Sequence, residues 1–113
     1  MAVIDIGTNS TRLMVADVDG NSVTELARHS EVTRLGRGVD YTQLLSDEAI
    51  EVVCQTVAGY VETIQELETE YTLVIATSAV RDASNGSAFV AELRERFELD
   101  CRVLDGDEEA RLT

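Results

Sequence analysis

Residues 3–13, VIDIGTNSTRL, join a short apolar strand to a polar turn. The segment Ala2–Ile6 is apolar except for one carboxylate, and Gly7 follows it directly. Glycine lets the backbone approach a ligand closely, and successive N–H groups in such a turn can bind anionic oxygens. The stretch therefore predicts either a phosphate-binding turn or a plain tight turn between two strands, and the spacing alone leaves both open.

The side chains around this turn have the chemistry that a phosphate or a hard cation requires. Thr, Asn and Ser offer hydrogen-bonding groups without bulk, a carboxylate is an oxygen ligand of the kind that Mg²⁺ prefers, and an arginine can contact a second phosphate. The stretch lacks the Gly-Lys-Ser/Thr ending of a Walker A loop and is not a GxGxxG motif. The candidate phosphate-binding residues are Asp5, Gly7, Thr8, Asn9, Ser10 and Arg12, and Asp5 is also the candidate metal ligand.

Patterns further along the chain predict an α/β protein. Asp19-Gly20-Asn21 predicts a hairpin, because Gly and Asn tolerate the positive φ that tight turns require. Apolar positions in residues 47–68 recur at three- and four-residue spacing, which predicts a long helix with Ser46 as its N-cap. Alternating strands and helices in the second half imply parallel pairing. The predicted order βββαβαβα consists of strands 2–6, 11–17 and 22–35, helix 47–68, strand 71–76, a loop at 77–83, a helix at 85–97 capped by Asn85, strand 101–104 and a helix that starts near residue 108.

The chain is strongly acidic, with a formal net charge of −13, and all nine of its basic residues are arginine. Non-specific binding to nucleic acid or to an anionic membrane needs a positive field, so the composition argues against both partners. An anionic ligand must then be held locally, by backbone amides, a metal ion or individual arginines. The spacing that a metal site requires is missing between Cys54, Cys101 and His29. No targeting or membrane segment is evident in the sequence either. We therefore expect a cytoplasmic protein with reduced thiols.

The segment DIGTNS, residues 5–10, resembles the first phosphate motif of the actin-like ATPase and sugar-kinase superfamily. The last two residues of this segment, Asn9-Ser10, together with Arg12-Leu13, resemble the motif of the Ppx/GppA branch in particular. This branch is the exopolyphosphatase and guanosine pentaphosphate phosphatase family. Two later segments resemble the same branch in the same order, ATSAVRDASN at 76–85 and LDGDEEARL at 104–112. The resemblance implies a ribonuclease-H-like (actin-like ATPase) mixed sheet, with three antiparallel strands followed by parallel strands with helices.

The two later segments imply roles for two charged residues. By the resemblance, Arg81 faces the active-site cleft and contacts phosphate, and Glu109 is the general base that activates water. Without the resemblance, an ion pair with Asp82 would explain Arg81, and a charged helix N-terminus would explain the glutamates. Asp105 replaces the serine that is usual in the family motif, so no hydroxyl role is carried over to that position.

The resemblance implies hydrolysis of terminal phosphoanhydride bonds in inorganic polyphosphate or in guanosine pentaphosphate (pppGpp), the alarmone of the stringent response. It also implies Mg²⁺ as a cofactor, and it leaves open a monovalent cation such as K⁺ and a homodimer of the full-length protein. The family's second phosphate motif, a DxGGGS-type loop, and its second lobe do not follow, so residues 1–113 are expected to be a truncated N-terminal phosphatase subdomain, inactive alone. The alternatives are an ATP-binding domain of actin-like or sugar-kinase type, and a non-catalytic sensor domain that binds an alarmone or phosphate.

Overall fold

The computed structural model describes residues 1–36, 42–69 and 71–104. Within these ranges, none of the helices combines the length and the apolar character needed to cross a lipid bilayer. The elements are β1 (Ala2–Ile6), β2 (Ser10–Asp19), β3 (Ser22–Val32), α2 (Asp47–Glu66), β4 (Thr72–Ala76), α3 (Ser78–Asp82), α4 (Gly86–Phe97) and β5 (Cys101–Val103).

The strands form one five-stranded mixed sheet in the order β3-β2-β1-β4-β5. β1 pairs antiparallel with β2, and β2 pairs antiparallel with β3. β4 runs parallel to β1, and β5 runs parallel to β4. The predicted sheet, antiparallel at first and parallel afterwards, is therefore confirmed. β1 is the central strand of the sheet. The turn that follows it therefore lies in the middle of the sheet edge formed by the carboxyl ends of β1 and β4.

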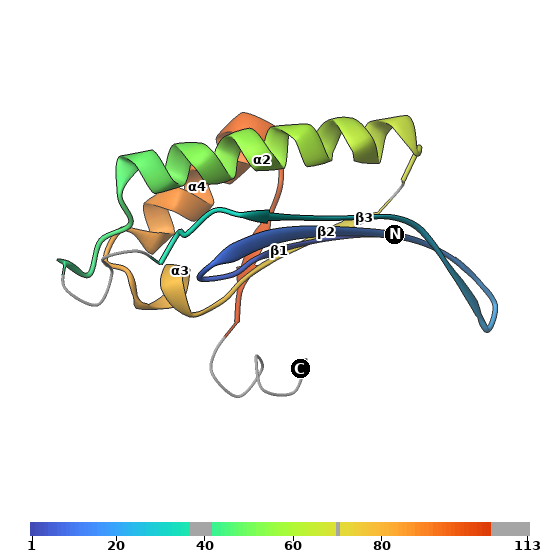
Figure 1. Ribbon diagram of the computed structural model, residues 1–113, viewed down its shortest axis with the longest axis horizontal. Helices are drawn as coiled ribbons and strands as arrows, with labels where there is room; N and C mark the ends of the chain where they lie inside the picture. The colour runs from blue at the N-terminus through green and yellow to red at the C-terminus, as the bar shows by residue number, and fades with distance from the viewer. Residues whose placement is uncertain (37–41, 70, 105–113) are drawn as a thin grey trace.

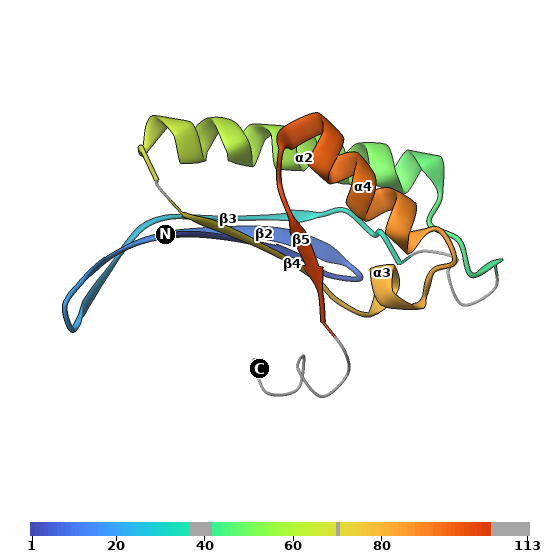
Figure 2. The same cartoon turned by 180° about the vertical axis from the view of Figure 1, so that it is seen from behind.

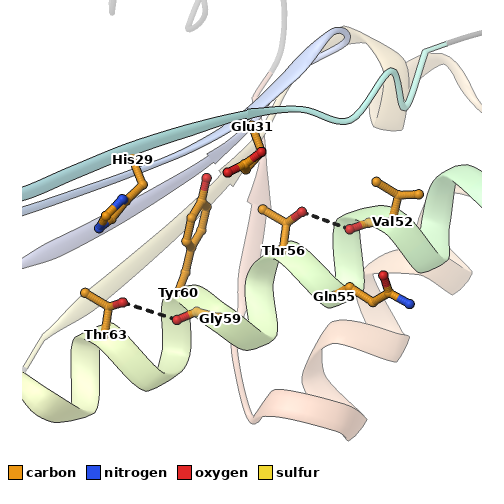
Figure 3. Close-up of a pocket in the computed structure, with 8 residues that line it drawn as sticks. All are labelled: His29, Glu31, Val52, Gln55, Thr56, Gly59, Tyr60 and Thr63. Atoms are coloured by element: carbon orange, nitrogen blue, oxygen red, sulfur yellow. Dashed lines mark hydrogen bonds between the residues drawn. The ribbon is translucent and has the colours of Figure 1, made fainter.

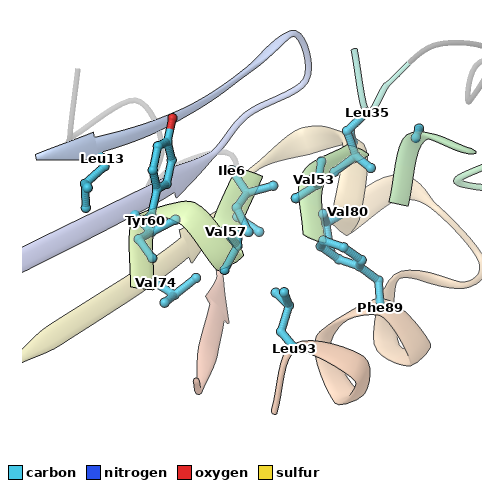
Figure 4. Close-up of a cluster of buried hydrophobic side chains, with 14 of the residues drawn as sticks. Ile6, Leu13, Leu35, Val53, Val57, Tyr60, Val74, Val80, Phe89 and Leu93 are labelled. Carbon is cyan, nitrogen blue, oxygen red and sulfur yellow. The ribbon is translucent and has the colours of Figure 1, made fainter. Parts of the chain in front are cut away.

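Both long helices, α2 and α4, cover the same face of the sheet (Figures 1 and 2). Alternate residues of β1 are buried on this face, which fixes the orientation of the strand and turns Asp5 to the opposite face. The core combines these strand residues with one side of each helix (Figure 4). Its labelled members are Ile6, Leu13, Leu35, Val53, Val57, Tyr60, Val74, Val80, Phe89 and Leu93.

Helix α2 begins as the sequence pattern predicts. The Ser46 hydroxyl accepts a hydrogen bond from the Ala49 N–H at 3.1 Å, which confirms the predicted N-cap. The helix ends at Glu66, two residues earlier than expected. Glu68 has a φ of 53°, so the chain leaves the helix through a left-handed residue, a feature that the apolar spacing does not encode.

The segment predicted to be a loop at residues 77–83 contains the short helix α3. Five residues are too few to show an apolar period, so the sequence pattern does not reveal this helix. Its Val80 is buried, and Gly86 lets α4 come so close that a Cβ there would lie 2.1 Å from the Val80 carbonyl oxygen. The order of the described elements is therefore βββαβααβ, and the helix expected from residue 108 lies outside the described residues.

The prediction that the Asn85 side chain caps α4 is wrong, because that side chain makes no cap hydrogen bond. Instead, its Nδ2 donates to the Leu45 carbonyl at 3.0 Å, and its Oδ1 accepts from the Leu45 N–H at 2.8 Å. The Ser84 N–H donates to the Gln43 carbonyl at 2.7 Å. These bonds tie the segment before α2 to the connection between α3 and α4.

Candidate functional site

The candidate site lies at the edge of the sheet where the parallel strands β1 and β4 end. Ile6 pairs with Ala76 at the end of both strands, and the Thr77 N–H donates to the Ile6 carbonyl at 3.2 Å. The turn after β1 and the start of α3 are therefore neighbours, although about seventy residues separate them in the sequence. The carboxyl ends of parallel strands are where open α/β sheets bind their ligands.

The turn itself is closed by one hydrogen bond and held by others. The Gly7 N–H donates to the Ser10 carbonyl at 2.9 Å. The Asn9 carbonyl accepts from the N–H groups of Thr33 and Arg34, both at 3.0 Å, which ends the pairing of β3 at Val32 rather than at the predicted residue 35. No acceptor among the described residues takes a hydrogen bond from the N–H groups of Thr8 and Asn9, so these two are the candidate anion donors.

The side chain of Thr8 joins this turn to α3. Its Oγ1 lies 2.8 Å from the Oγ of Ser78 in a partly buried position. Asn9 is exposed and Ser10 is half-buried. The edge therefore presents several hydroxyl and amide groups close to two N–H donors, a set that can surround an anion without a large positive charge.

Asp5 and Arg12 lie on the face of the sheet that α2 and α4 leave uncovered. They are directly paired across β1 and β2, and both line a hollow of about 460 Å³. Arg28 of β3 and Ile75 of β4 also line this hollow. The structure thus places Asp5 and Arg12 together beside the turn on the sheet face, while Gly7, Thr8 and Asn9 form the turn.

Asp5 offers carboxylate oxygens, which are the ligands that a hard cation such as Mg²⁺ prefers. One of them, Oδ1, is buried. Among residues 1–36, 42–69 and 71–104, no group of three or more His, Cys, Asp or Glu side chains is arranged to hold a metal ion. Mg²⁺ is commonly bound through one or two carboxylates, with water and substrate phosphates as the remaining ligands. The residues present therefore fit a cation that arrives with a phosphate.

Arg81 lies in the last turn of α3 and reaches the end of β5. Its Nη1 donates to the Leu104 carbonyl at 3.2 Å, and its Nε lies 3.2 Å from Asp82 Oδ1. The Asp82 side chain is 62% exposed, so that ion pair contributes little to stability. The structure thus brings the turn and the arginine helix to one edge, whereas Glu109 lies outside the described residues.

A second hollow, of about 410 Å³, lies between β3 and α2 on the helix-covered face (Figure 3). There the Tyr60 hydroxyl donates to the Thr11 carbonyl at 2.8 Å, and its ring stacks on His29 with the centroids 6.3 Å apart. Burial raises the pKa of Tyr60, and the nearby Glu31 carboxylate raises it further. These groups hold β2 and β3 on α2, and the acidic Glu31 makes this hollow a poor site for an anion.

Comparison with known families agrees with the motifs. A model of the Ppx/GppA phosphatase family matches residues 14–113. This chain belongs to the Ppx/GppA phosphatase family. The family predicted from the segments at residues 5–10, 76–85 and 104–112 is thereby confirmed.

The Ppx/GppA chain is similar to both curated and solved proteins. It is 34% identical to a bifunctional 3-dehydroquinate synthase/phosphatase of Fusobacterium nucleatum, over 96% of this chain and 18% of that protein. It matches the crystal structure of the Aquifex aeolicus Ppx/GppA family member with a TM-score of 0.93 and 30% identity, over 97% of this chain and 36% of that one. An exopolyphosphatase from Cytophaga hutchinsonii matches with a TM-score of 0.94 and 27% identity, over 98% and 36%. The chain thus spans about a third or less of the length of these relatives.

Ser78 contacts the turn of the candidate site in this Ppx/GppA chain, and the sequence alone predicts no role for it. It follows Ala76 by two residues, just as Thr8 follows Ile6, and Ile6 and Ala76 are paired. Residues that lie the same number of positions beyond a paired couple in two parallel strands can bring their side chains together. Ser78 therefore joins the site through the register of β1 and β4, which no local motif contains.

Proposed function

We propose that this chain supplies the phosphate-binding part of a hydrolase that removes the terminal phosphate from inorganic polyphosphate or guanosine pentaphosphate. The observation that carries the proposal is the contact of the turn after β1 with α3, through Thr8 and Ser78, at the carboxyl edge of β1 and β4. Family membership and the similarity to an exopolyphosphatase support the same chemistry.

In this proposal the described residues position the phosphate and balance its charge. The N–H groups of Thr8 and Asn9 bind phosphate oxygens, and the hydroxyl groups of Thr8 and Ser10 add donors. Phosphoryl transfer depends mainly on such positioning and on charge stabilisation. Because a guanidinium has five N–H donors, Arg81 can contact a phosphate while it also donates to the Leu104 carbonyl. Arg12 supplies a second positive charge on the neighbouring sheet face.

Asp5 is the proposed holder of a Mg²⁺ ion. When bound, the ion would neutralise part of the charge of the phosphate chain, which matters in a protein with a net charge of −13. We expect phosphate release by the full-length protein to require Mg²⁺ and to be lost in excess chelator. Full activity in the chelator would contradict this part of the proposal. A requirement for K⁺ is tested in the same assay by exchange for Na⁺.

Glu109 is the proposed general base, which takes a proton from the attacking water. Removal of a general base typically lowers the rate by about 10²–10⁴-fold. In a full-length protein that contains this chain, we expect Glu109→Gln to lower kcat by that range and to leave the circular dichroism spectrum unchanged. Glu108→Gln is the matched control, because in the helix expected from the sequence adjacent residues would point about 100° apart, and its kcat should stay close to wild type.

The deciding experiment compares substrates on the full-length protein. Phosphate release is measured with inorganic polyphosphate, guanosine pentaphosphate and ATP, and the 113-residue chain is assayed alone and is expected to be inactive. Release from polyphosphate or guanosine pentaphosphate supports the proposal and ranks the two substrates. Heat protection by ATP without such release would favour a kinase-type or actin-like domain, and alarmone binding without any release would favour a sensor. A cytoplasmic location and a homodimer remain predictions.

A further inference from the structure

Two segments that are distant in the sequence hold Thr8. Its Oγ1 lies 2.8 Å from Ser78 Oγ, and its carbonyl accepts a hydrogen bond from the Gly36 N–H at 2.9 Å. A Cβ on Gly36 would lie 2.3 Å from the Thr8 Cγ2 methyl group, so a side chain at position 36 would displace that methyl group. Thr8 is therefore held at its hydroxyl, at its methyl group and at its carbonyl.

These contacts favour one rotamer of the threonine. A β-branched side chain is stiff about χ1, and here each of its two branches lies against a different neighbour. The methyl group fits where Gly36 has no side chain, and the hydroxyl meets the hydroxyl of Ser78. The parallel register of β1 and β4, with Ile6 opposite Ala76, brings Thr8 and Ser78 together.

We propose that Ser78 and Gly36 are positioning residues that fix the Thr8 rotamer so that its hydroxyl is ready to bind phosphate. The proposal rests on the proposed function for its ligand. When Ser78 donates its proton to Thr8 Oγ1, the Thr8 proton remains available to a phosphate oxygen, because a hydroxyl both donates and accepts. A rotamer that is fixed before binding removes an ordering cost from the affinity.

The rotamer is measured directly in the 113-residue chain by NMR. The three-bond couplings from Thr8 Cγ2 to its amide nitrogen and to its carbonyl carbon report χ1. We expect one rotamer in the wild type and in Ser78→Thr, averaged couplings in Ser78→Ala, and couplings of a different rotamer in Gly36→Ala, where the new Cβ would displace the methyl group. Ser87→Ala and Gly59→Ala are the controls, since Ser87 is exposed on α4 and a Cβ on Gly59 would meet no atom within 4 Å. Unchanged couplings in Ser78→Ala would overturn the proposal.

The link to binding is measured by calorimetry with inorganic tripolyphosphate on the full-length protein that contains this chain. Because one hydrogen bond is at issue, we expect Ser78→Ala to weaken the affinity by about three- to tenfold, and Ser78→Thr to restore it to within about twofold. In a Thr8→Val background, Ser78→Ala should cause no further loss. An equal loss in that background would show that Ser78 does not act through Thr8, and would overturn the proposal. If the wild type binds no tripolyphosphate, the proposed function of the turn fails, whereas the couplings still decide whether the rotamer is fixed.

Discussion

The turn after β1 and the hairpin tip between β2 and β3 are both short, polar and glycine-containing, but the rest of the chain holds them very differently. The Asn9 carbonyl accepts hydrogen bonds from Thr33 and Arg34, and Thr8 contacts Ser78. At the tip, Gly20 has a φ of 61°, and a Cβ on it would meet no atom within 4 Å. The hairpin tip thus needs only a permissive backbone, whereas the first turn is fitted to its neighbours.

Contacts with distant segments, rather than turn composition, therefore distinguish the turn that is proposed to bind phosphate from a turn that only links two strands. We use "clamped end" for residues 7–9, 33–36 and 77–86, and "hairpin tip" for residues 19–22. The clamped end is held by hydrogen bonds between segments far apart in the sequence and by close packing at glycines. Each such contact restricts the conformations of the turn before a ligand arrives, which is the condition for a preorganised site.

The largest effect that we expect from loosening the clamped end comes from Gly86→Ala. The new Cβ would lie 2.1 Å from the Val80 carbonyl oxygen, which is backbone and cannot turn aside. Overpacking of this kind typically costs 1–3 kcal/mol, so we expect a loss of about 2–3 kcal/mol in the free energy of unfolding, measured by urea denaturation.

The matched substitution at the hairpin tip is Gly20→Asn. Asparagine tolerates the left-handed conformation, and there is open space for its side chain, so we expect a change below about 0.5 kcal/mol. Similar losses from Gly86→Ala and Gly20→Asn would remove the distinction between the two regions.

Alkaline pH is expected to lower the stability of the fold through Cys101, a residue outside the clamped end. Cys101 lies on β5, which pairs with β4 at Val74, and burial raises the pKa of its thiol from 9.0 to about 11. Between these values the unfolded chain has lost a proton that the folded chain still binds, so stability falls as pH rises from about 9 to 11. A pKa difference of this size corresponds to about 3 kcal/mol in full, of which about 2 kcal/mol is lost by pH 11.

The measurement is the stability difference between the wild type and Cys101→Val, taken from urea unfolding at several pH values. Tyr60 and Cys54 also have raised pKa values, and they titrate in both proteins, so their effects cancel in the difference. We expect the wild type to lose about 2 kcal/mol relative to the variant between pH 8 and pH 11. If the stability difference between the wild type and Cys101→Val did not change with pH, the Cys101 thiol would not be buried in the folded chain.

The sequence predicts the elements whose signal is a local pattern. The structure is needed for the features that depend on contacts between distant segments. The apolar spacing of residues 47–68 and the cap at Ser46 predicted α2, because helix period and capping are local properties. The position of the turn after β1 is also predictable, since Gly7 and its polar neighbours are contiguous, whereas their phosphate-binding role stays a prediction. A prediction from local pattern can be correct to within a few residues at such places.

The prediction failed where one segment meets another. α3 has too few residues to show a period, and the Asn85 side chain bonds Leu45, forty residues away, instead of capping its own helix. The contact between Thr8 and Ser78 depends on the register of two strands, which neither segment encodes alone. The role of Glu109 stays a prediction, because that residue lies outside the described residues.

A smaller effect is expected from Tyr60→Phe, which removes one bond that holds β2 just after the clamped end. The Tyr60 hydroxyl donates to the Thr11 carbonyl at 2.8 Å, and Phe would remove this bond while Thr11 stays paired with Glu31 in the β2–β3 ladder. We expect a loss of about 1 kcal/mol in urea unfolding, the net contribution of one hydrogen bond. Tyr71→Phe is the control, because Tyr71 is 63% exposed, and it should change little. Equal effects of the two substitutions would mean that the Thr11 bond does not contribute.

The smallest expected effect, and the only gain, comes from Gly59→Ala in the middle of α2. This glycine lies within the helix, and a Cβ on it would meet no atom within 4 Å. Alanine is favoured over glycine in a helix interior by about 0.8–1.0 kcal/mol, so we expect a rise of about 0.5–1 kcal/mol in the free energy of unfolding. The three glycines then rank by their role. Gly86 allows close contact with the Val80 backbone, Gly20 supplies a positive φ, and Gly59 does neither. A loss of stability from Gly59→Ala would show that close contact does not explain this ranking, and the case for a clamped end would weaken with it.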